Sequence, residues 1–108
     1  MQKEKILHTA DTFKLLSDPT RLSIIHLLAN TKEELCVGDI AEKVGISQSA
    51  TSHQLAKLES KGVVFCTRKG QIACYAIASN ELTENLKKVI EVFDNTSYAR
   101  KAFEYIKK

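Results

Sequence analysis

Apolar residues recur at helical spacing along most of the chain. Residues about 3–16 form a first amphipathic segment, which predicts a helix. The segment after Asp18-Pro19 is so densely apolar that we expect a largely buried second helix. Asp18 suits the N-cap of that helix and Pro19 suits its first position. The same spacing predicts further helices over residues about 37–44, 48–60, 81–94 and 97–107.

Two other segments have the β-branched and aromatic composition of strands. They span residues about 63–67 and 72–77 and are joined around Arg68-Lys69-Gly70-Gln71, whose glycine is typical of a hairpin turn. The length of the turn decides the register. A three-residue turn would place Cys66 directly opposite Cys74, whereas a two-residue turn would point the two side chains to opposite faces. The sequence alone leaves both registers open.

The order of these elements, ααααββαα, predicts a mainly α fold of the α+β class, the winged helix-turn-helix. Gly45 ends the third helix, because glycine readily takes the left-handed conformation of a helix stop, and Ser47 caps the fourth. Residues about 37–60 then form the helix-turn-helix and residues about 63–78 form the wing. We expect one domain over residues 1–108.

The first and last helices have apolar faces that a small helical core does not wholly cover. These faces belong to residues about 3–16 and 81–107. A partner subunit would cover them, so we expect a homodimer joined through the terminal helices. The alternative is that these helices pack on their own core.

The predicted fourth helix has one face of small and polar residues. Ala50, Thr51, Leu55 and Leu58 are expected to point inward. Acidic residues are absent from Val44 to Leu58, as expected where phosphate must approach. Exposed helix positions usually hold strong helix formers, and this face has few. The outward positions, at spacings of three, four and seven or eight, are Gln48, Ser49, Ser52, His53, Ala56 and Lys57.

These side chains suit contacts with DNA. Gln48 can make a bidentate contact with adenine, and Ser49 or Ser52 can bond to bases or phosphates. His53 can donate to a base or a phosphate, and Lys57 is better placed for the backbone. The alternative is an ordinary solvated helix face.

The charge distribution points to the same region. The chain has 108 residues and a net charge of +3. Residues 61–78 contain Lys61, Arg68 and Lys69 and no acidic residue, so this segment alone carries a charge of +3. A wing that contacts phosphate needs such an excess, although a merely solvated hairpin tip would show it too.

Other classes of protein find little support in the sequence. No apolar run approaches the length of a membrane span, and the N-terminus lacks the apolar stretch of a signal peptide. Three cysteines, an odd number, favour free thiols in a reducing compartment, so we expect a cytoplasmic protein with no membrane partner. The three histidines have no Ser or Cys partner at a catalytic spacing, and no glycine-rich phosphate loop is present. We therefore expect no enzyme.

Three stretches together resemble the ArsR/SmtB family of winged-helix repressors. They are SDPTRLSII, ELCVGDIAEKVGISQSATSHQLAKLESKGVV and RKGQIACYAI. The resemblance implies a homodimer joined largely through the first and fifth helices. It also implies binding of a double-stranded operator, an inverted repeat, with release by an inducer. By position it makes the following residues DNA-facing: Gln48, Ser49, Thr51, Ser52, His53, Arg68, Lys69 and Gln71.

Two points stay open within this resemblance. The helical spacing places Thr51 partly inward, at odds with its implied contact. A winged-helix module that binds protein instead of specific DNA is the alternative function, and the basic hairpin tip argues against it.

The family's sensing sites are incomplete in this chain. One uses a cysteine pair in an ELCVCD motif; here Cys36 is present, but Gly38 stands at the second position and His8 is the nearest other candidate ligand. A lone Cys36 cannot make a closed thiolate site, so a soft metal there is unsupported. The family's zinc site on the fifth helix falls on Ser79, Glu81, Val92 and Asn95, most of which ligate poorly. We therefore expect no cofactor.

The remaining candidates for sensing are thiols. Cys36 is the main one because its position matches a family site, and Cys66 and Cys74 are weaker ones. Thiol sensing normally needs a resolving cysteine, and none is evident near Cys36 in the sequence. Each cysteine is otherwise an ordinary small core residue, and His26 is expected to be a buried, hydrogen-bonded side chain.

Overall fold

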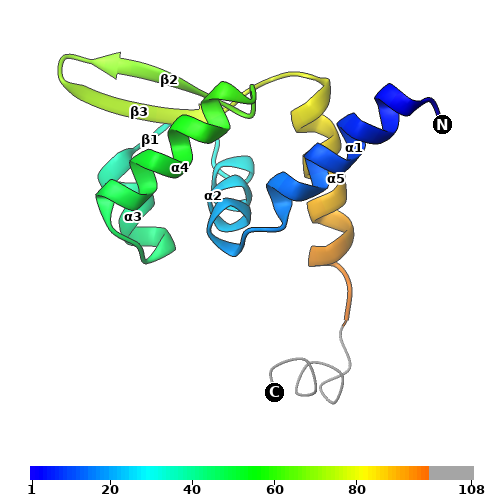
Figure 1. The fold of residues 1–108 in the computed structure, drawn as a ribbon. Helices are drawn as coiled ribbons and strands as arrows, with labels where there is room; N and C mark the ends of the chain where they lie inside the picture. The colour runs from blue at the N-terminus through cyan, green and yellow to red at the C-terminus, as the bar shows by residue number, and fades with distance from the viewer. Residues whose placement is uncertain (98–108) are drawn as a thin grey trace.

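Helices and a small sheet alternate along the chain in the computed structural model, which describes residues 1–97. The elements run in the order α1 (Lys3–Leu16), α2 (Pro19–Ala29), β1 (Leu35–Cys36), α3 (Val37–Val44), α4 (Gln48–Ser60), β2 (Val64–Lys69), β3 (Ile72–Ile77) and α5 (Glu81–Asp94) (Figure 1). The winged helix-turn-helix predicted from the sequence is confirmed. The helix predicted at residues about 97–107 lies almost wholly outside the described residues.

The ends of the helices follow the predicted caps. The Asp18 side chain accepts a hydrogen bond from the Arg21 backbone N–H at 2.9 Å, and Pro19 occupies the first turn of α2. Ser47 accepts from the Ala50 N–H at 3.0 Å at the start of α4. Between α3 and α4, Gly45 has φ 83°, a left-handed conformation that a β-carbon would strain. The turn of the helix-turn-helix is therefore specified locally.

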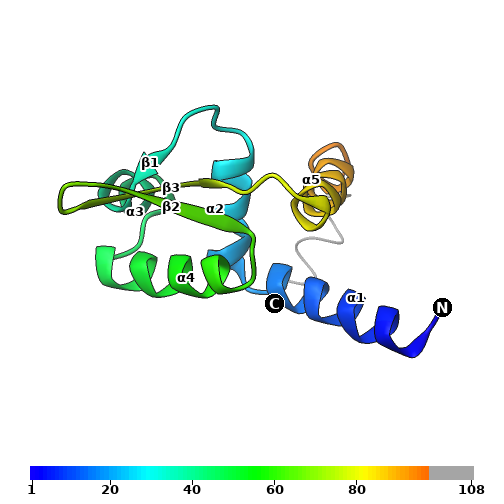
Figure 2. The same cartoon turned by 90° about the horizontal axis from the view of Figure 1, so that it is seen from above.

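The hydrophobic core lies between α2, α3, α4, the sheet and one side of α5. Its members are Ile24, Ile25, Leu28, Ile40, Leu55, Leu58, Val63, Val64, Tyr75, Leu86 and Ile90. Seen from above, the wing and α4 lie at one end of the molecule, and α1 and α5 lie at the other (Figure 2). Only Thr83, Leu86 and Ile90 of α5 are buried, and no residue of α1 is buried.

The sheet has three antiparallel strands in the order β1-β3-β2. β2 continues to Lys69, two residues beyond the predicted end, and Lys69 pairs with Ile72. The turn therefore contains two residues, Gly70 and Gln71, and Gly70 has φ 67°, as type II′ hairpin turns require. Cys66 consequently lies opposite Tyr75, and of the two registers left open, the one that faces Cys66 toward Cys74 is wrong.

The structure corrects two further expectations and adds one strand that was not expected. The strand β1 was not expected, because two residues are too few for a periodic signal. Ala50 is exposed although it was expected to point inward, because it lies one position before the buried row that begins at Thr51. Leu22 is 37% exposed, so α2 is less completely buried than its composition suggested.

Candidate nucleic-acid interface

The outer face of α4 carries the side chains expected to read DNA. Gln48, Ser49, Ser52, His53 and Lys57 are all exposed. They lie opposite the buried row of α4, which anchors the helix to the core. The first turn of α4 has no acidic residue, so its free backbone N–H groups and positive dipole end are available to phosphate.

Thr51 is the exception among the expected DNA-facing residues. Its side chain has no exposed surface, and its hydroxyl donates to the Ser47 carbonyl at 2.8 Å. A side chain in that position supports the packing of α4 and cannot reach a base. The assignment of Thr51 to DNA was therefore wrong, and the helical spacing, which placed it inward, was the better guide.

Gln48 lies at the junction of the two helices of the motif. A β-carbon placed on Gly38 of α3 would lie 3.4 Å from Gln48 Nε2, so the Gln48 amide rests beside the first turn of α3. This packing limits the conformations of a side chain that is free toward solvent on its other side. A restricted amide suits bidentate contact with a base edge, because less conformational freedom is lost on binding.

The wing carries its cations at the end of β2. Arg68, Lys69 and Gln71 are exposed. Lys69 pairs with Glu34, whose carboxylate reaches the wing from the loop before β1. The hydrogen bond from Lys69 lowers the pKa of Glu34, and the same bond raises the pKa of Lys69. The charge of the wing is therefore smaller than the segment 61–78 suggested, because the fold adds an acid from elsewhere in the chain.

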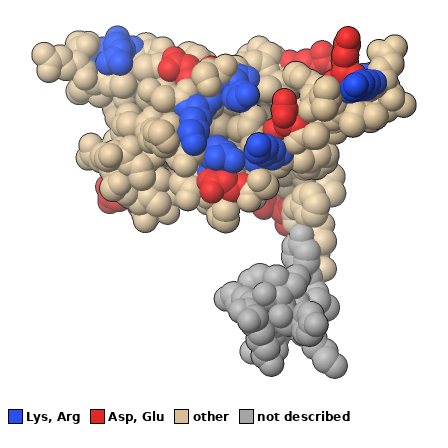
Figure 3. Space-filling view, in the orientation of Figure 1, with Lys and Arg blue, Asp and Glu red and all other residues tan. Residues whose placement is uncertain are grey.

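A basic hollow extends the surface from α4 toward α1. Its walls include Lys14 of α1, Arg21 of α2, and Lys57 and Lys61 at the end of α4, with Asp11 at one side. In Figure 3 basic side chains gather in the middle of this face, with acidic ones beside them. Arg21 is partly engaged, because its guanidinium donates to the carbonyls of Lys14 and Leu15 at 3.1 Å each.

Sequence reasoning missed Lys14 and Lys61 as members of this surface. Lys61 was counted with the wing, whereas it lies beside Lys57 across the hollow from Lys14. A charge count by segment cannot detect this grouping, because α1 and α4 meet only in the fold.

Known proteins share this arrangement. Residues 18–64 match the profile described as "Bacterial regulatory protein, arsR family". The chain is 35% identical over 84% of its length to the transcriptional repressor SmtB homolog of Synechocystis sp., covering 67% of that relative.

The chain belongs to the ArsR family. It is 45% identical over 60% of its length to the cadmium resistance transcriptional regulatory protein CadC of Listeria innocua, but it spans only 54% of that relative. A solved structure, the homodimeric winged helix-turn-helix DNA-binding domain Mb0332 from Mycobacterium bovis, superposes with a TM-score of 0.69 at 30% identity, covering 87% of this chain and 88% of that one. The Synechocystis relative is named a transcriptional repressor and CadC a transcriptional regulatory protein, and this chain is a DNA-binding transcriptional regulator of the ArsR type.

The cysteines of this ArsR-family chain are arranged differently from expectation. Cys36 and Cys74 are directly opposed on β1 and β3, with their sulfur atoms 2.7 Å apart. The sequence showed no second cysteine near Cys36, and the fold places Cys74 beside it. The hydrogen bond to Cys36, together with burial, raises the pKa of Cys74 to about 11. No signal in the sequence pointed to this pair, because the short strand β1 that brings Cys36 opposite Cys74 was not predicted.

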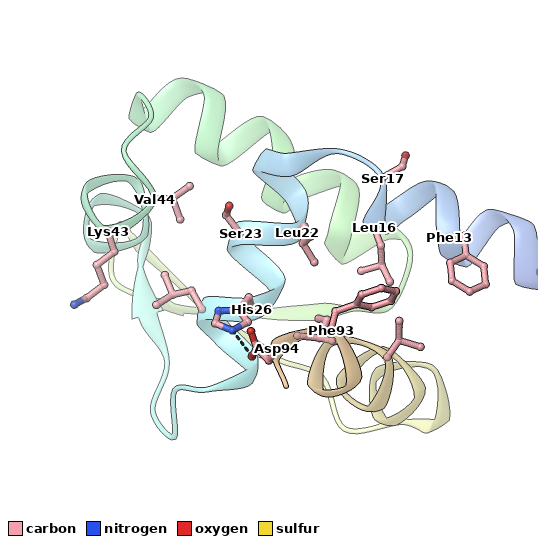
Figure 4. Close-up of a pocket in the computed structure, with 13 residues that line it drawn as sticks. Phe13, Leu16, Ser17, Leu22, Ser23, His26, Lys43, Val44, Phe93 and Asp94 are labelled. Atoms are coloured by element: carbon pink, nitrogen blue, oxygen red, sulfur yellow. Dashed lines mark hydrogen bonds and ion pairs between the residues drawn. The ribbon is translucent and has the colours of Figure 1, made fainter. Parts of the chain in front are cut away.

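Apolar side chains line a groove of about 790 Å³ between α1, α2, α3 and α5. Phe13 and Phe93 stand at one end of it, and His26 bonds to Asp94 across it at 2.8 Å (Figure 4). The expectation of a hydrogen-bonded His26 is correct, but its side chain is 46% exposed rather than buried. This bond ties α2 to the end of α5.

Metal ligands do not gather in the part of the chain that the structure describes. Within residues 1–97 no three His, Cys, Asp or Glu side chains are placed to share an ion. No helix among these residues is both long enough and apolar enough to cross a membrane.

Proposed function

We propose that this protein is a homodimeric repressor that binds an inverted-repeat operator through α4 and the wing. One observation carries the proposal: α4 presents an exposed row of small polar side chains, free of acids, beside a basic hollow. A helix of this kind fits the major groove, while flanking cations contact the phosphates on either side.

The side chains divide into two roles on this proposal. Gln48 and His53 read base edges, because both are exposed on the outer face of α4 and can pair with groups in the major groove. Ser49 and Ser52 are short enough to let the helix approach closely. The cations contact phosphates and so position the protein on the duplex. They are Lys57, Arg68 and Lys69, together with Lys14 and Lys61 of the basic hollow. Gln71, at the wing turn, adds a neutral polar contact.

The dimer is supported by the exposed apolar surface of the terminal helices. Ile6, Leu7 and Phe13 of α1 are 51%, 58% and 55% exposed, and Val92 and Phe93 of α5 are exposed as well. A helix with no fully buried residue gains little stability from packing on its own subunit. We therefore expect a second copy of the chain to cover these exposed side chains. The homodimeric Mycobacterium bovis neighbour supports the same assembly. A two-fold dimer requires a two-fold operator.

We infer in addition that an inducer releases the operator and that the protein acts in the cytoplasm, where the chromosome is. Cys36 is the sensing candidate, since it begins the helix that packs against the reading helix. The zinc positions of the family fall here on Ser79, Glu81, Val92 and Asn95, so the proposal invokes no metal cofactor.

The experiment is selection of duplexes from a random pool, followed by titration of the selected duplex in fluorescence anisotropy. We expect an inverted repeat bound with a Kd in the range of about 10⁻⁸–10⁻¹¹ M, falling steeply with salt. Gln48→Ala should relax preference at one base pair in each half-site by about 1–3 kcal/mol. Lys57→Ala should weaken all sequences alike and reduce the salt slope by about 1 for each subunit.

The matched control is Lys88→Ala, which removes the same charge from an exposed site on α5. It should leave the slope unchanged. If no duplex is preferred over random DNA at moderate salt, the proposal fails. A stable protein partner captured without DNA affinity would then favour the alternative, a winged-helix module that binds protein.

A further inference from the structure

Cys36 and Cys74 form a thiol pair that the DNA-reading surface does not use. Their sulfur atoms lie 2.7 Å apart although the residues are 38 positions apart in the chain, so only the folded sheet brings them together. They are direct partners in the antiparallel register of β1 and β3. Cys66, the remaining cysteine, lies opposite Tyr75 and so points to the other face of the sheet.

The geometry suits a disulfide better than a metal site. A closed thiolate site needs more ligands than two, and residues 1–97 provide no third His, Cys, Asp or Glu for one. Directly opposed residues in an antiparallel pair have Cα atoms about 4.5–5.5 Å apart, which is within the range that a disulfide spans. The strands therefore need little movement to bring the sulfurs into bonding distance.

The two cysteines differ in access to solvent. Cys74 is 4% exposed, whereas Cys36 is partly exposed at the start of α3, so an oxidant in solution meets Cys36 first. The Cys36 and Cys74 sulfur atoms are already in hydrogen-bonding contact, and this contact and burial raise the pKa of Cys74 to about 11. The charge of Lys69 opposes the rise in the pKa of Cys74, although the hydrogen bond to Cys36 and burial outweigh it.

We propose that Cys36 and Cys74 are a redox pair that a peroxide oxidant converts into an intrachain disulfide between β1 and β3. The Cys36 thiolate attacks one peroxide oxygen, the O–O bond breaks, and Cys36 becomes a sulfenic acid while the other oxygen leaves as water. The Cys74 sulfur then attacks the Cys36 sulfur, the S–O bond breaks, and a second water carries away the Cys74 proton. The thiols lose two electrons and the peroxide gains them. A dithiol reductant reverses the reaction by exchange.

The disulfide would act on both parts of the DNA-reading surface. Cys36 is the N-cap of α3 and lies two positions before Gly38, which is beside the Gln48 amide. Cys74 belongs to β3, which carries the wing. A disulfide needs a torsion near 90° about its S–S bond, so its closure fixes β1, the start of α3 and the wing in one arrangement. This step rests on the proposed function, and we expect the oxidised protein to bind the operator at least about fivefold more weakly.

The first test needs no DNA. The full chain is reduced, treated with hydrogen peroxide, and its remaining thiols are alkylated before digestion and mass spectrometry. We expect a crosslink between the Cys36 and Cys74 peptides, two hydrogens lighter than the reduced pair, with Cys66 alkylated. Cys66→Ser should form the same crosslink and Cys36→Ser should not. The melting temperature should rise by about 10 °C on oxidation of the wild type and Cys66→Ser, and not of Cys36→Ser.

The outcomes separate the redox pair from its regulatory effect. Crosslinks through Cys66, crosslinks between two copies, or oxidation without a Cys36–Cys74 bond would overturn the redox pair. The second test titrates the selected operator with reduced and oxidised Cys66→Ser protein. An intrachain disulfide with unchanged affinity would overturn the regulatory step, whereas reduced protein without any preferred duplex would overturn the proposed function and leave the crosslink result standing.

Discussion

The two ends of this molecule are packed very differently. At the end that carries α4 and the wing, which we propose binds DNA and call the reading end, α2, α3, α4 and the sheet enclose side chains such as Ile24, Leu55 and Leu58 that have no exposed surface. At the other end, α1 buries no residue, and Phe13 and Phe93 remain more than half exposed. The reading end is complete in one copy of the chain. The terminal end gains most of its packing only when something covers it.

Because of this difference, the two ends should contribute to different properties: the reading end to the stability of each subunit, and the terminal end to the formation of the dimer. A side chain buried in the reading end stabilises the fold of each subunit, since its transfer from water is already complete. An exposed apolar side chain of α1, such as Leu7, contributes little to one subunit and more to an interface that covers it, whereas Leu15 and Leu16 already pack against the core. A substitution that removes apolar surface should therefore lower the free energy of unfolding at the reading end and weaken the dimer at the terminal end.

The largest effect should come from the reading end. Leu55→Ala removes buried methyl groups and leaves a cavity, so the free energy of unfolding should fall by about 2–5 kcal/mol. The matched change at the other end, Leu7→Ala, should cost less than about 0.5 kcal/mol in the isolated subunit, since Leu7 is exposed there. Urea unfolding at protein concentrations below dimerisation measures both. Equal costs would show that α1 packs as tightly as the core.

The next effect concerns the terminal end. Phe13→Asp places a charge where the proposed interface would bury an aromatic ring, so the dimer dissociation constant should rise more than about 100-fold while the subunit stays folded. Sedimentation velocity and circular dichroism measure the two properties. Asp11→Asn on the same helix is the control for a change of charge. A Phe13→Asp protein that stays dimeric would remove α1 from the interface.

Local signals made most of the fold predictable. The caps at Asp18 and Ser47 and the stop at Gly45 depend on residues adjacent in the sequence, and all three are present in the structure. Features that depend on distant residues were missed. The strand β1 is too short to show a period, and its partner is 38 positions away.

The same limit applies to the candidate site. The exposed face of α4 follows from helical spacing, whereas the inward Thr51 was assigned to DNA from resemblance against that spacing. The pairing of Lys69 with Glu34 is invisible to a charge count, because it joins the loop before β1 to the wing. The local sequence pattern and the family resemblance predict the helices, the strands and their exposed faces. Contacts between segments that are distant in the sequence become visible only in the folded structure.

A smaller effect should come from the junction between the two ends. Asp18 caps α2, and its substitution in Asp18→Ala should cost about 1 kcal/mol of unfolding free energy, because the Arg21 N–H loses its acceptor. This cost should fall on the reading end and leave the dimer constant unchanged. The control is Ser17→Ala, whose exposed hydroxyl donates to a carbonyl of α1 instead and should matter less than about 0.5 kcal/mol. A dimer that weakens with Asp18→Ala would show that the two ends are coupled at this junction.

The smallest effect lies within the reading end and should change DNA binding alone. Glu34→Gln releases Lys69 from its ion pair, so operator affinity should rise and the slope of log K against log salt should steepen by about 1 for each subunit. Glu33→Gln is the matched control, because it removes the same charge from the adjacent exposed residue. If both variants steepen the slope equally, general electrostatics explains the change and the specific pairing does not.

The pH dependence gives an independent check on the same pair. The pKa of Glu34 is lowered in the folded protein, so its stabilising contribution is present above the ordinary value of 4.5 and is lost as the pH falls through the folded value. Thermal melts of wild type and Glu34→Gln should therefore differ slightly at neutral pH and converge at acidic pH. The dimer constant should be the same for both at neutral pH, since β1, which follows Glu34 directly, lies at the opposite end of the molecule from α1 and α5 (Figures 1 and 2). A substitution at the wing that shifted this constant would mean that the reading end and the terminal end are not independent.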